Sequence, residues 1–198
     1  IVNPPKDQRY NDCWIYSSLS VLETKLLKSG FTANNFSTEH MNLWATTKSN
    51  GKGWLRSITS DGYAFTALGY LSSWQGGIEQ SDFESFADEY NPDTDLSSLV
   101  NYGATAIKYL DNCSREEIKQ EIMDNGSIYA AYSHSTFYEN SDRTAYFCPK
   151  GSPKATGHAI AIVGWDDDFA KENFKTANGI LPENNGAWLV KNSWGNYN

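Results

Sequence analysis

Three cysteines and three histidines are the residues of this chain that could together perform nucleophilic chemistry. A cysteine attacks as its thiolate, which forms more readily at a helix N-terminus and beside an imidazolium. Cys13 begins the strongest amphipathic pattern in the sequence and so meets the first condition. Taken alone, however, a cysteine at a helix start is more often an inert buried residue than a nucleophile.

The imidazole that such a thiol requires must come from His40, His134 or His158. His40 falls within a predicted helix and is expected at the surface, whereas His134 ends a predicted strand and could face solvent or a cleft. His158 directly precedes the apolar stretch Ala159–Val163, so a rigid strand would hold its ring. Any one of these histidines, considered alone, is more often structural than catalytic.

A proton-shuttling imidazole also requires a partner on its second ring nitrogen. Asn192 lies in the segment Lys-Asn-Ser-Trp-Gly, directly after the apolar run Trp188–Val190. Its amide could accept the ring N–H without adding charge, which would leave a thiolate–imidazolium pair intact. Trp194 could cover that hydrogen bond and exclude water, although the same segment could also be an ordinary turn.

The spacing of apolar residues predicts helices in the first half of the chain. The helix that starts at Cys13 and stops at Gly30 has one apolar face, made of Ile15, Leu19, Leu22 and Leu26. Further helices are expected over residues 38–44, with Ser37 as the cap, over 63–74, and from a capping box at 114–117 to Gly126.

Short apolar stretches suited to buried strands follow over residues 128–132, 157–165 and 187–193, with a surface loop or insertion over 166–185. Helices followed by strands predict an α+β fold in one unit of 198 residues. We expect a helical lobe over about 10–100 and a β-rich lobe over about 101–198, with a cleft between them and the boundary near residues 91–102.

Composition excludes some classes of function. The net charge of −8 is unsuited to nucleic acid or an anionic membrane surface. No apolar run approaches the roughly 20 residues that span a bilayer, and no cofactor or metal site is expected. The three cysteines allow a Cys113–Cys148 disulfide or three free thiols, and both alternatives remain open.

The order of these residues resembles the papain family of cysteine peptidases: Gln8, Cys13-Trp14, His158-Ala159 and Asn192-Ser193-Trp194-Gly195. His158 follows Cys13 by about 145 residues, within the spacing typical of papain and the cathepsins. The resemblance covers nearly the whole chain. It implies a papain-like fold, in which a helical lobe and a barrel-like sheet lobe enclose the active-site cleft, and a thiol protease activity.

The resemblance also implies a role for each matching residue. Cys13 would form a thioester with the substrate acyl group, His158 would protonate the leaving amine, and Asn192 would orient His158. Gln8 and the Cys13 backbone N–H would donate to the oxyanion. Trp14 and Trp194 would support the site.

The same resemblance implies a substrate-binding surface. The stretch Asp61-Gly62-Tyr63 is similar to the family's Gly-Gly-Tyr, which pairs with an extended peptide. Gly62 would therefore bind substrate backbone, while Tyr63 and Ala64 border a side-chain pocket. The other side of that pocket would be formed by Ala159, Tyr132 and Ser133.

Several features depart from the family pattern. Gln8 lies one residue closer to the cysteine than usual, the partner cysteine after the second helix is absent, and the His-to-Asn segment is long, which looks more like bacterial members. Both ends look short, so we expect a piece of a longer protein, with a propeptide or further domains outside it. The expected location is secreted or at the cell surface, or a lysosome-like compartment in a eukaryote.

Two other functions compete with an endopeptidase that hydrolyses peptides or proteins. Cysteine–histidine triads also serve peptidoglycan amidases and transglutaminases, although these lack the Asn-Ser-Trp-Gly ending. The third possibility is a catalytically impaired papain-like domain used for binding or adhesion, which the short Gln8–Cys13 spacing would favour.

Overall fold

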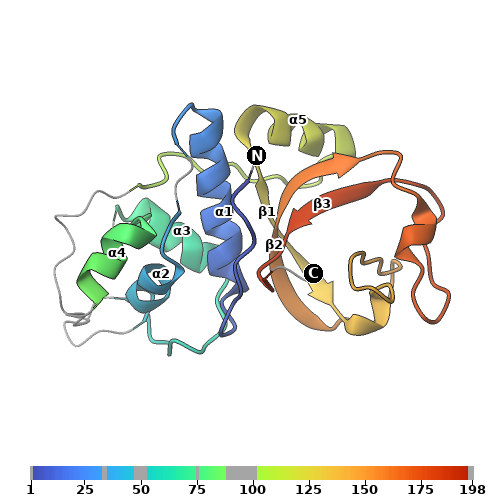
Figure 1. Cartoon of the computed structure of the whole chain (residues 1–198), viewed down its shortest axis with the longest axis horizontal. Helices are drawn as coiled ribbons and strands as arrows, with labels where there is room; N and C mark the ends of the chain where they lie inside the picture. The colour runs from blue at the N-terminus through green and yellow to red at the C-terminus, as the bar shows by residue number, and fades with distance from the viewer. Residues whose placement is uncertain (1, 33–34, 47–52, 75, 88–101, 196–198) are drawn as a thin grey trace.

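The computed structural model describes residues 2–32, 35–46, 53–74, 76–87 and 102–195 (Figure 1). The helices and strands of this part are α1 (Cys13–Lys28), α2 (Thr38–Trp44), α3 (Ala64–Ser72), α4 (Gln80–Ala87), α5 (Arg115–Asn125), β1 (Ile128–His134), the 3-10 helix η1 (Thr136–Tyr138), β2 (Thr156–Asp166), η2 (Lys171–Phe174) and β3 (Ala187–Lys191). The predicted boundary between the lobes, over 91–102, lies outside the described residues except for Tyr102.

The long helix α1 is the centre of the core. Trp14 and Ile15 are fully buried and Leu19 nearly so, and burial of each such side chain stabilises the fold by about 1.5–3 kcal/mol. The helix ends where Ser29 N–H bonds to the carbonyls of the last turn, and Gly30 follows at a φ of 86°. The predicted helix and its stop at Gly30 are therefore confirmed.

Local capping determines the shorter helices. Ser37 Oγ accepts the N–H of His40 and opens α2, and a reciprocal capping box between Ser114 and Glu117 opens α5, as predicted. The third helix is shorter than predicted, because Tyr63 is its extended N-cap and not a helical residue. The helix α4 was not predicted, since its Gln-Ser-Asp-Phe-Glu-Ser-Phe-Ala sequence contains several residues with modest helix propensity.

His40 contradicts the expectation of a surface histidine. It is 2% exposed, and its Nδ1 lies 2.7 Å from the Tyr70 hydroxyl. The rings of Trp44 and Phe83 also lie within 6 Å of the His40 ring, measured between centroids. The prediction was wrong because it considered α2 alone, whereas α3 and α4 cover this side of α2.

The three strands form one antiparallel sheet in the order β1-β2-β3. Tyr132 on β1 lies opposite His158, and Lys191 on β3 lies opposite Ala161, with an irregularity in β2 between Ile162 and Gly164. The expectation of a buried third strand over 187–193 was partly wrong. The strand ends at Lys191, and as an edge of the described sheet it leaves Leu189 63% exposed.

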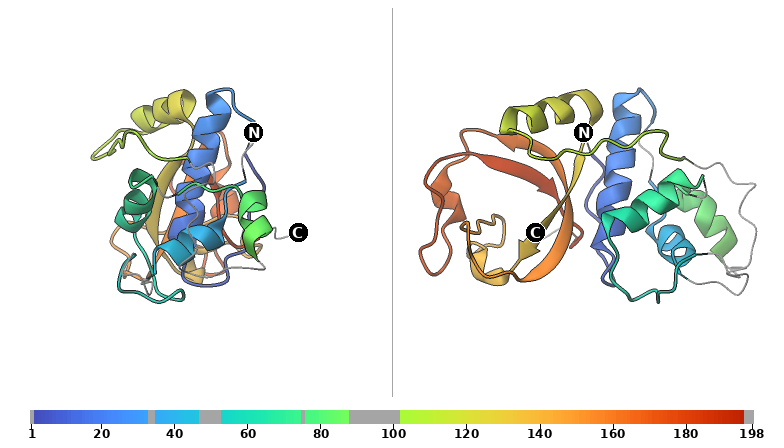
Figure 2. Two further views of the ribbon diagram at one scale, coloured as in Figure 1. Left: turned by 90° about the vertical axis from the view of Figure 1, so that its left-hand side faces the viewer. Right: turned by 180° about the vertical axis from the view of Figure 1, so that it is seen from behind.

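Helices α1 to α4 lie on one side of the molecule and the sheet lies on the other, as Figure 1 and the right-hand view of Figure 2 show. The contact between the two sides is made chiefly by α1, which packs against β2. Helix α5 lies over the end of this contact and touches both elements. The start of α1 is thereby brought against the first half of β2, at Ala159.

Two further expectations can be compared with this fold. Of the two alternatives for the cysteines, the structure has three free thiols, so Cys113 and Cys148 are not bridged. None of the described helices combines the length and apolar character needed to cross a bilayer.

Candidate active site

Cys13 is the first residue of α1, and its thiol faces β2. The backbone N–H of Ala159 donates to Cys13 Sγ at 3.4 Å. The neighbouring Trp14 is completely buried, so the first turn of α1 is anchored in the core. Ala159, which is 4% exposed, is the residue next to His158. The helix start and the strand therefore meet at the positions that the sequence singled out.

His158 is held in a defined orientation. The ring Nε2–H donates to Asn192 Oδ1 at 2.7 Å, and the same oxygen accepts the backbone N–H of Ser193 at 2.8 Å. The Trp194 ring stacks on the His158 ring with centroids 4.6 Å apart and planes inclined by 25°. Asn192 and Trp194 thus both lie against the His158 ring.

Gln8 is attached to the segment that carries Asn192. Its backbone N–H donates to the Ser193 carbonyl at 2.7 Å, and the Ser193 hydroxyl donates to Gln8 Oε1 at 2.5 Å. Gln8 Nε2 donates to the Tyr10 carbonyl at 2.8 Å. These bonds hold both the oxygen and the nitrogen of the Gln8 side-chain amide.

The segment before α3 borders the same region. Gly62 packs closely against the indole of Trp14, where an added Cβ would come within 2.3 Å of the ring. Only glycine fits this close approach. Tyr63 is 72% exposed and caps α3, of which Ala64 is the first residue. The structure therefore holds this segment against the residue that follows Cys13.

Tyr132 and Ser133 lie on β1, which pairs with the strand that carries His158. The Tyr132 ring meets the His158 ring edge to face, with centroids 5.7 Å apart. Ser133 is already engaged, because its hydroxyl accepts the Ala155 N–H at 2.5 Å and its carbonyl accepts the Tyr146 hydroxyl at 2.6 Å.

The surroundings of Cys13 favour the uncharged thiol. Burial raises the pKa of Cys13, and the nearby carboxylates of Asp12 and Asp61 raise it further. The backbone N–H groups of Ala159 and Trp14 oppose these effects by stabilising the thiolate.

The pKa of the His158 imidazole is shifted downward. Burial lowers the pKa of His158, the hydrogen bond to Asn192 opposes this, and the positive charge that His134 carries when protonated lowers the pKa further. These surroundings therefore favour a neutral His158 imidazole and a neutral Cys13 thiol.

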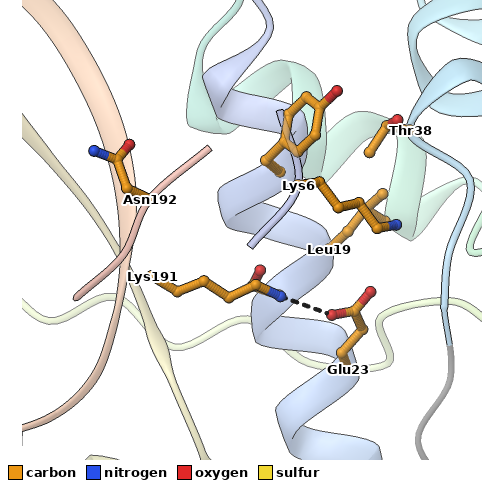
Figure 3. A pocket seen from close by; sticks show the side chains of 8 residues that line it. Lys6, Leu19, Glu23, Thr38, Lys191 and Asn192 are labelled. Atoms are coloured by element: carbon orange, nitrogen blue, oxygen red, sulfur yellow. Dashed lines mark hydrogen bonds and ion pairs between the residues drawn. The ribbon is translucent and has the colours of Figure 1, made fainter. Parts of the chain in front are cut away.

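A buried ionic cluster ties α1 to the segments that flank the site (Figure 3). Lys191 Nζ lies 3.2 Å from Glu23 Oε2, and the two side chains are 8% and 3% exposed. Lys6 extends toward the same carboxylate and donates to the Phe36 carbonyl at 2.8 Å. Lys191 directly precedes Asn192, so the cluster anchors the start of the segment that carries it.

Comparison with known proteins identifies the family. A family model described as "Papain family cysteine protease" matches residues 1–197. The chain belongs to the papain family of cysteine proteases. The resemblance stated from the sequence is therefore confirmed.

Solved papain-family structures share the fold. The cysteine protease and lectin-like domains of Cwp84, a surface layer associated protein of Clostridium difficile, superpose with a TM-score of 0.83 at 36% identity, covering 99% of this chain and 43% of that one. A clostridial Cwp84 structure after propeptide cleavage gives the same TM-score at 37% identity, covering 98% and 48%. The predicted α+β papain-like fold is confirmed.

Animal members of the papain family are more distant in sequence. Procathepsin L of Felis catus is 27% identical over 201 residues, covering 98% of this chain and 54% of the relative. The chain thus spans about half the length of the curated relatives it matches.

The papain-family motifs did not indicate every residue that shapes the site. Glu23 was missed, although it lies four residues after Leu19 and three before Leu26, on the apolar face of α1. A charge in that position was the available signal for a buried ion pair. The position of His134 beside His158 had no such signal, because it depends on the register of β1 against β2.

Proposed function

We propose that this papain-family domain hydrolyses peptide bonds by way of Cys13, His158 and Asn192. The proposal is carried by one arrangement: the residue next to His158 donates its N–H to Cys13 Sγ at 3.4 Å, while His158 itself is bonded to Asn192 at 2.7 Å. Family membership and the 36–37% identity to clostridial cysteine protease structures support it.

The tautomer of His158 defines the direction of proton transfer. Because Nε2 carries the hydrogen that Asn192 accepts, Nδ1 is the basic nitrogen. Nδ1 takes the Cys13 proton as sulfur attacks the scissile carbonyl, and then gives it to the leaving amine. The resulting thioester is hydrolysed by water, with His158 acting as the base.

Gln8 supplies a donor for the oxyanion. Its amide nitrogen has two hydrogens, of which Tyr10 accepts one, so the other remains for substrate together with the Cys13 backbone N–H. Ser193 holds the opposite end of the Gln8 amide. One such donor contributes about 100- to 1000-fold in rate.

Substrate lies along the segment Gly62–Ala64 on the helical side and along Ala159 with Tyr132 and Ser133 on the sheet side. The backbone at Gly62, which is half-buried, pairs with an extended peptide, and the exposed Tyr63 ring borders the side-chain pocket. Peptides and proteins are the substrates, and no feature of the described residues favours a peptidoglycan amidase or a purely binding domain.

The whole protein is secreted or located at the cell surface, with a propeptide or further domains outside this chain. The solved relative is a surface layer associated protein with a lectin-like domain, and a second structure of it follows propeptide cleavage.

Cleavage of an unfolded protein or a fluorogenic peptide tests the proposal. The substitution Cys13→Ala is expected to abolish cleavage, while Cys113→Ser, which removes another free thiol, is expected to leave it unchanged. Cleavage that persists in Cys13→Ala would refute the assignment of the nucleophile. Hydrolysis of cell-wall fragments in place of peptides would refute the assignment of the substrate.

A further inference from the structure

A second histidine lies beside the one assigned to catalysis. His134 ends β1, two residues after Tyr132, which pairs with His158 across the sheet. Since side chains two apart along a strand share a face, His134 and His158 project from the same side. Their ring centroids are 6.0 Å apart. The Trp194 ring contacts both, at 4.6 Å from His158 and 4.8 Å from His134.

His134 has a counter-ion of its own. Its Nε2 lies 3.6 Å from Glu139 Oε1, and the Glu139 side chain is only 10% exposed. The titratable and charged groups around His134 are Tyr132 on β1, His158 on β2, and Glu139 and Tyr146 in the loop after η1. Arg143, in the same loop, contacts Glu139. Burial raises the pKa of Tyr146 to about 12 and that of Tyr132 further, so both hydroxyls stay neutral.

The two histidines therefore differ in how well they hold a proton. A buried carboxylate faces His134, whereas His158 faces the neutral amide of Asn192. Burial lowers the pKa of His134, and Glu139 opposes that effect, while the charge of protonated His134 lowers the pKa of His158. On acidification the first proton is expected at His134.

We propose that His134 is a positioning residue which, held by Glu139, takes up a proton before His158 and so keeps the Cys13–His158 pair in its reactive protonation state at acidic pH. This inference rests on the proposed function. In the reactive state the thiol and the imidazole share one proton, and a second proton on His158 stops the reaction because the imidazole can no longer accept from sulfur.

The size of the effect follows from the distance. A unit charge 6.0 Å away repels the second proton enough to move the acid limit of activity by about 0.5 to 2 pH units, depending on the effective dielectric constant. The alkaline limit is unaffected, because His134 is neutral there. A purely structural histidine would change the rate at every pH and would leave both limits in place.

Three substitutions separate charge from packing, with kcat/KM measured against pH. His134→Phe keeps a ring against Trp194 but cannot be protonated, and it is expected to raise the acid limit by about 0.5 to 2 pH units. Glu139→Gln removes the counter-ion and is expected to move the limit in the same direction by less. Asp142→Asn, a matched loss of an exposed carboxylate in the same loop, is expected to change neither limit.

Two measurements that need no turnover separate this inference from the proposed function. Alkylation of Cys13 by iodoacetamide should show the same shifted pH dependence, and NMR titration of the three histidine rings should show His134 protonating before His158. If His134→Phe and Glu139→Gln hydrolyse peptide with the wild-type acid limit, or if His158 protonates first, the inference is overturned. If alkylation shifts as expected but no peptide is cleaved, the proposed function fails and the inference stands.

Discussion

The substitution Glu23→Gln keeps the shape of the side chain but removes the negative charge that Lys191 contacts inside the molecule. The ammonium group of Lys191 would then be buried without its counter-ion, with Lys6 extending toward the same position (Figure 3). Because the Glu23 and Lys191 side chains are 3% and 8% exposed, bulk solvent cannot solvate the ammonium group in place of the lost carboxylate.

The loss of stability expected for Glu23→Gln follows from the burial of this ion pair. Removing one partner of a buried ion pair costs about 3–5 kcal/mol. The glutamine oxygen can still accept a hydrogen bond from Lys191, so we expect the lower end, about 3 kcal/mol of unfolding free energy. In a domain of this size that loss lowers the melting temperature by about 6–12 °C. Asn192 follows Lys191 directly, so a lower kcat in the folded variant is also expected.

Urea unfolding followed by tryptophan fluorescence measures the loss. The matched control is Glu39→Gln, the same chemical change in an exposed pair, because Arg9 and Glu39 are 3.9 Å apart with side chains 80% and 55% exposed. The unfolding free energy of the Glu39→Gln variant should stay within about 1 kcal/mol of the wild-type value. The double substitution Glu23→Leu with Lys191→Met should be less destabilised than Glu23→Gln. Equal stability of the Glu23→Gln and Glu39→Gln variants would refute the reasoning.

Three further predictions concern catalysis. Asn192→Ala removes the 2.7 Å bond to His158 and is expected to lower kcat by about 10- to 100-fold with little change in KM; an unchanged kcat would contradict the orienting role. Gln8→Ala should lower kcat/KM by about 100- to 1000-fold, and a loss below tenfold would place the oxyanion elsewhere. Activity should fall on the acid side only below the ordinary pKa of histidine, because protonated His158, whose pKa burial lowers, cannot accept the thiol proton. On the alkaline side it should fall only above the ordinary pKa of a thiol, where Cys13, whose pKa burial raises, has lost the proton meant for the leaving amine; a kcat/KM profile narrower than these limits would contradict both shifts.

Features encoded within a few residues were predictable from the sequence. The apolar face of α1, the Ser37 cap and the capping box at Ser114 each depend on neighbours three or four positions away. The order of Cys13, His158 and Asn192 could likewise be read from short motifs. The distances between these residues could not, because they arise from the packing of α1 on β2.

Features that depend on contacts between distant segments were missed. The burial of His40 requires α3 and α4 to cover α2, and the ion pair of Glu23 with Lys191 joins the first helix to the last strand. The proximity of His134 to His158 depends on strand register, since a shift by one residue would turn His134 to the opposite face. Tertiary packing determines all three, and local sequence patterns carry little information about it.

Mass mapping after treatment with an epoxide inhibitor of the papain class tests whether Cys13 is the nucleophile. The chain offers three free thiols, so the label reports which of them is activated by its surroundings. We predict one mass equivalent on Cys13, none on Cys113 or Cys148, and slower labelling of Cys13 in the Asn192→Ala variant than in the wild-type protein. An unmodified Cys13 in folded protein, or a label spread equally over the three cysteines, would contradict this prediction.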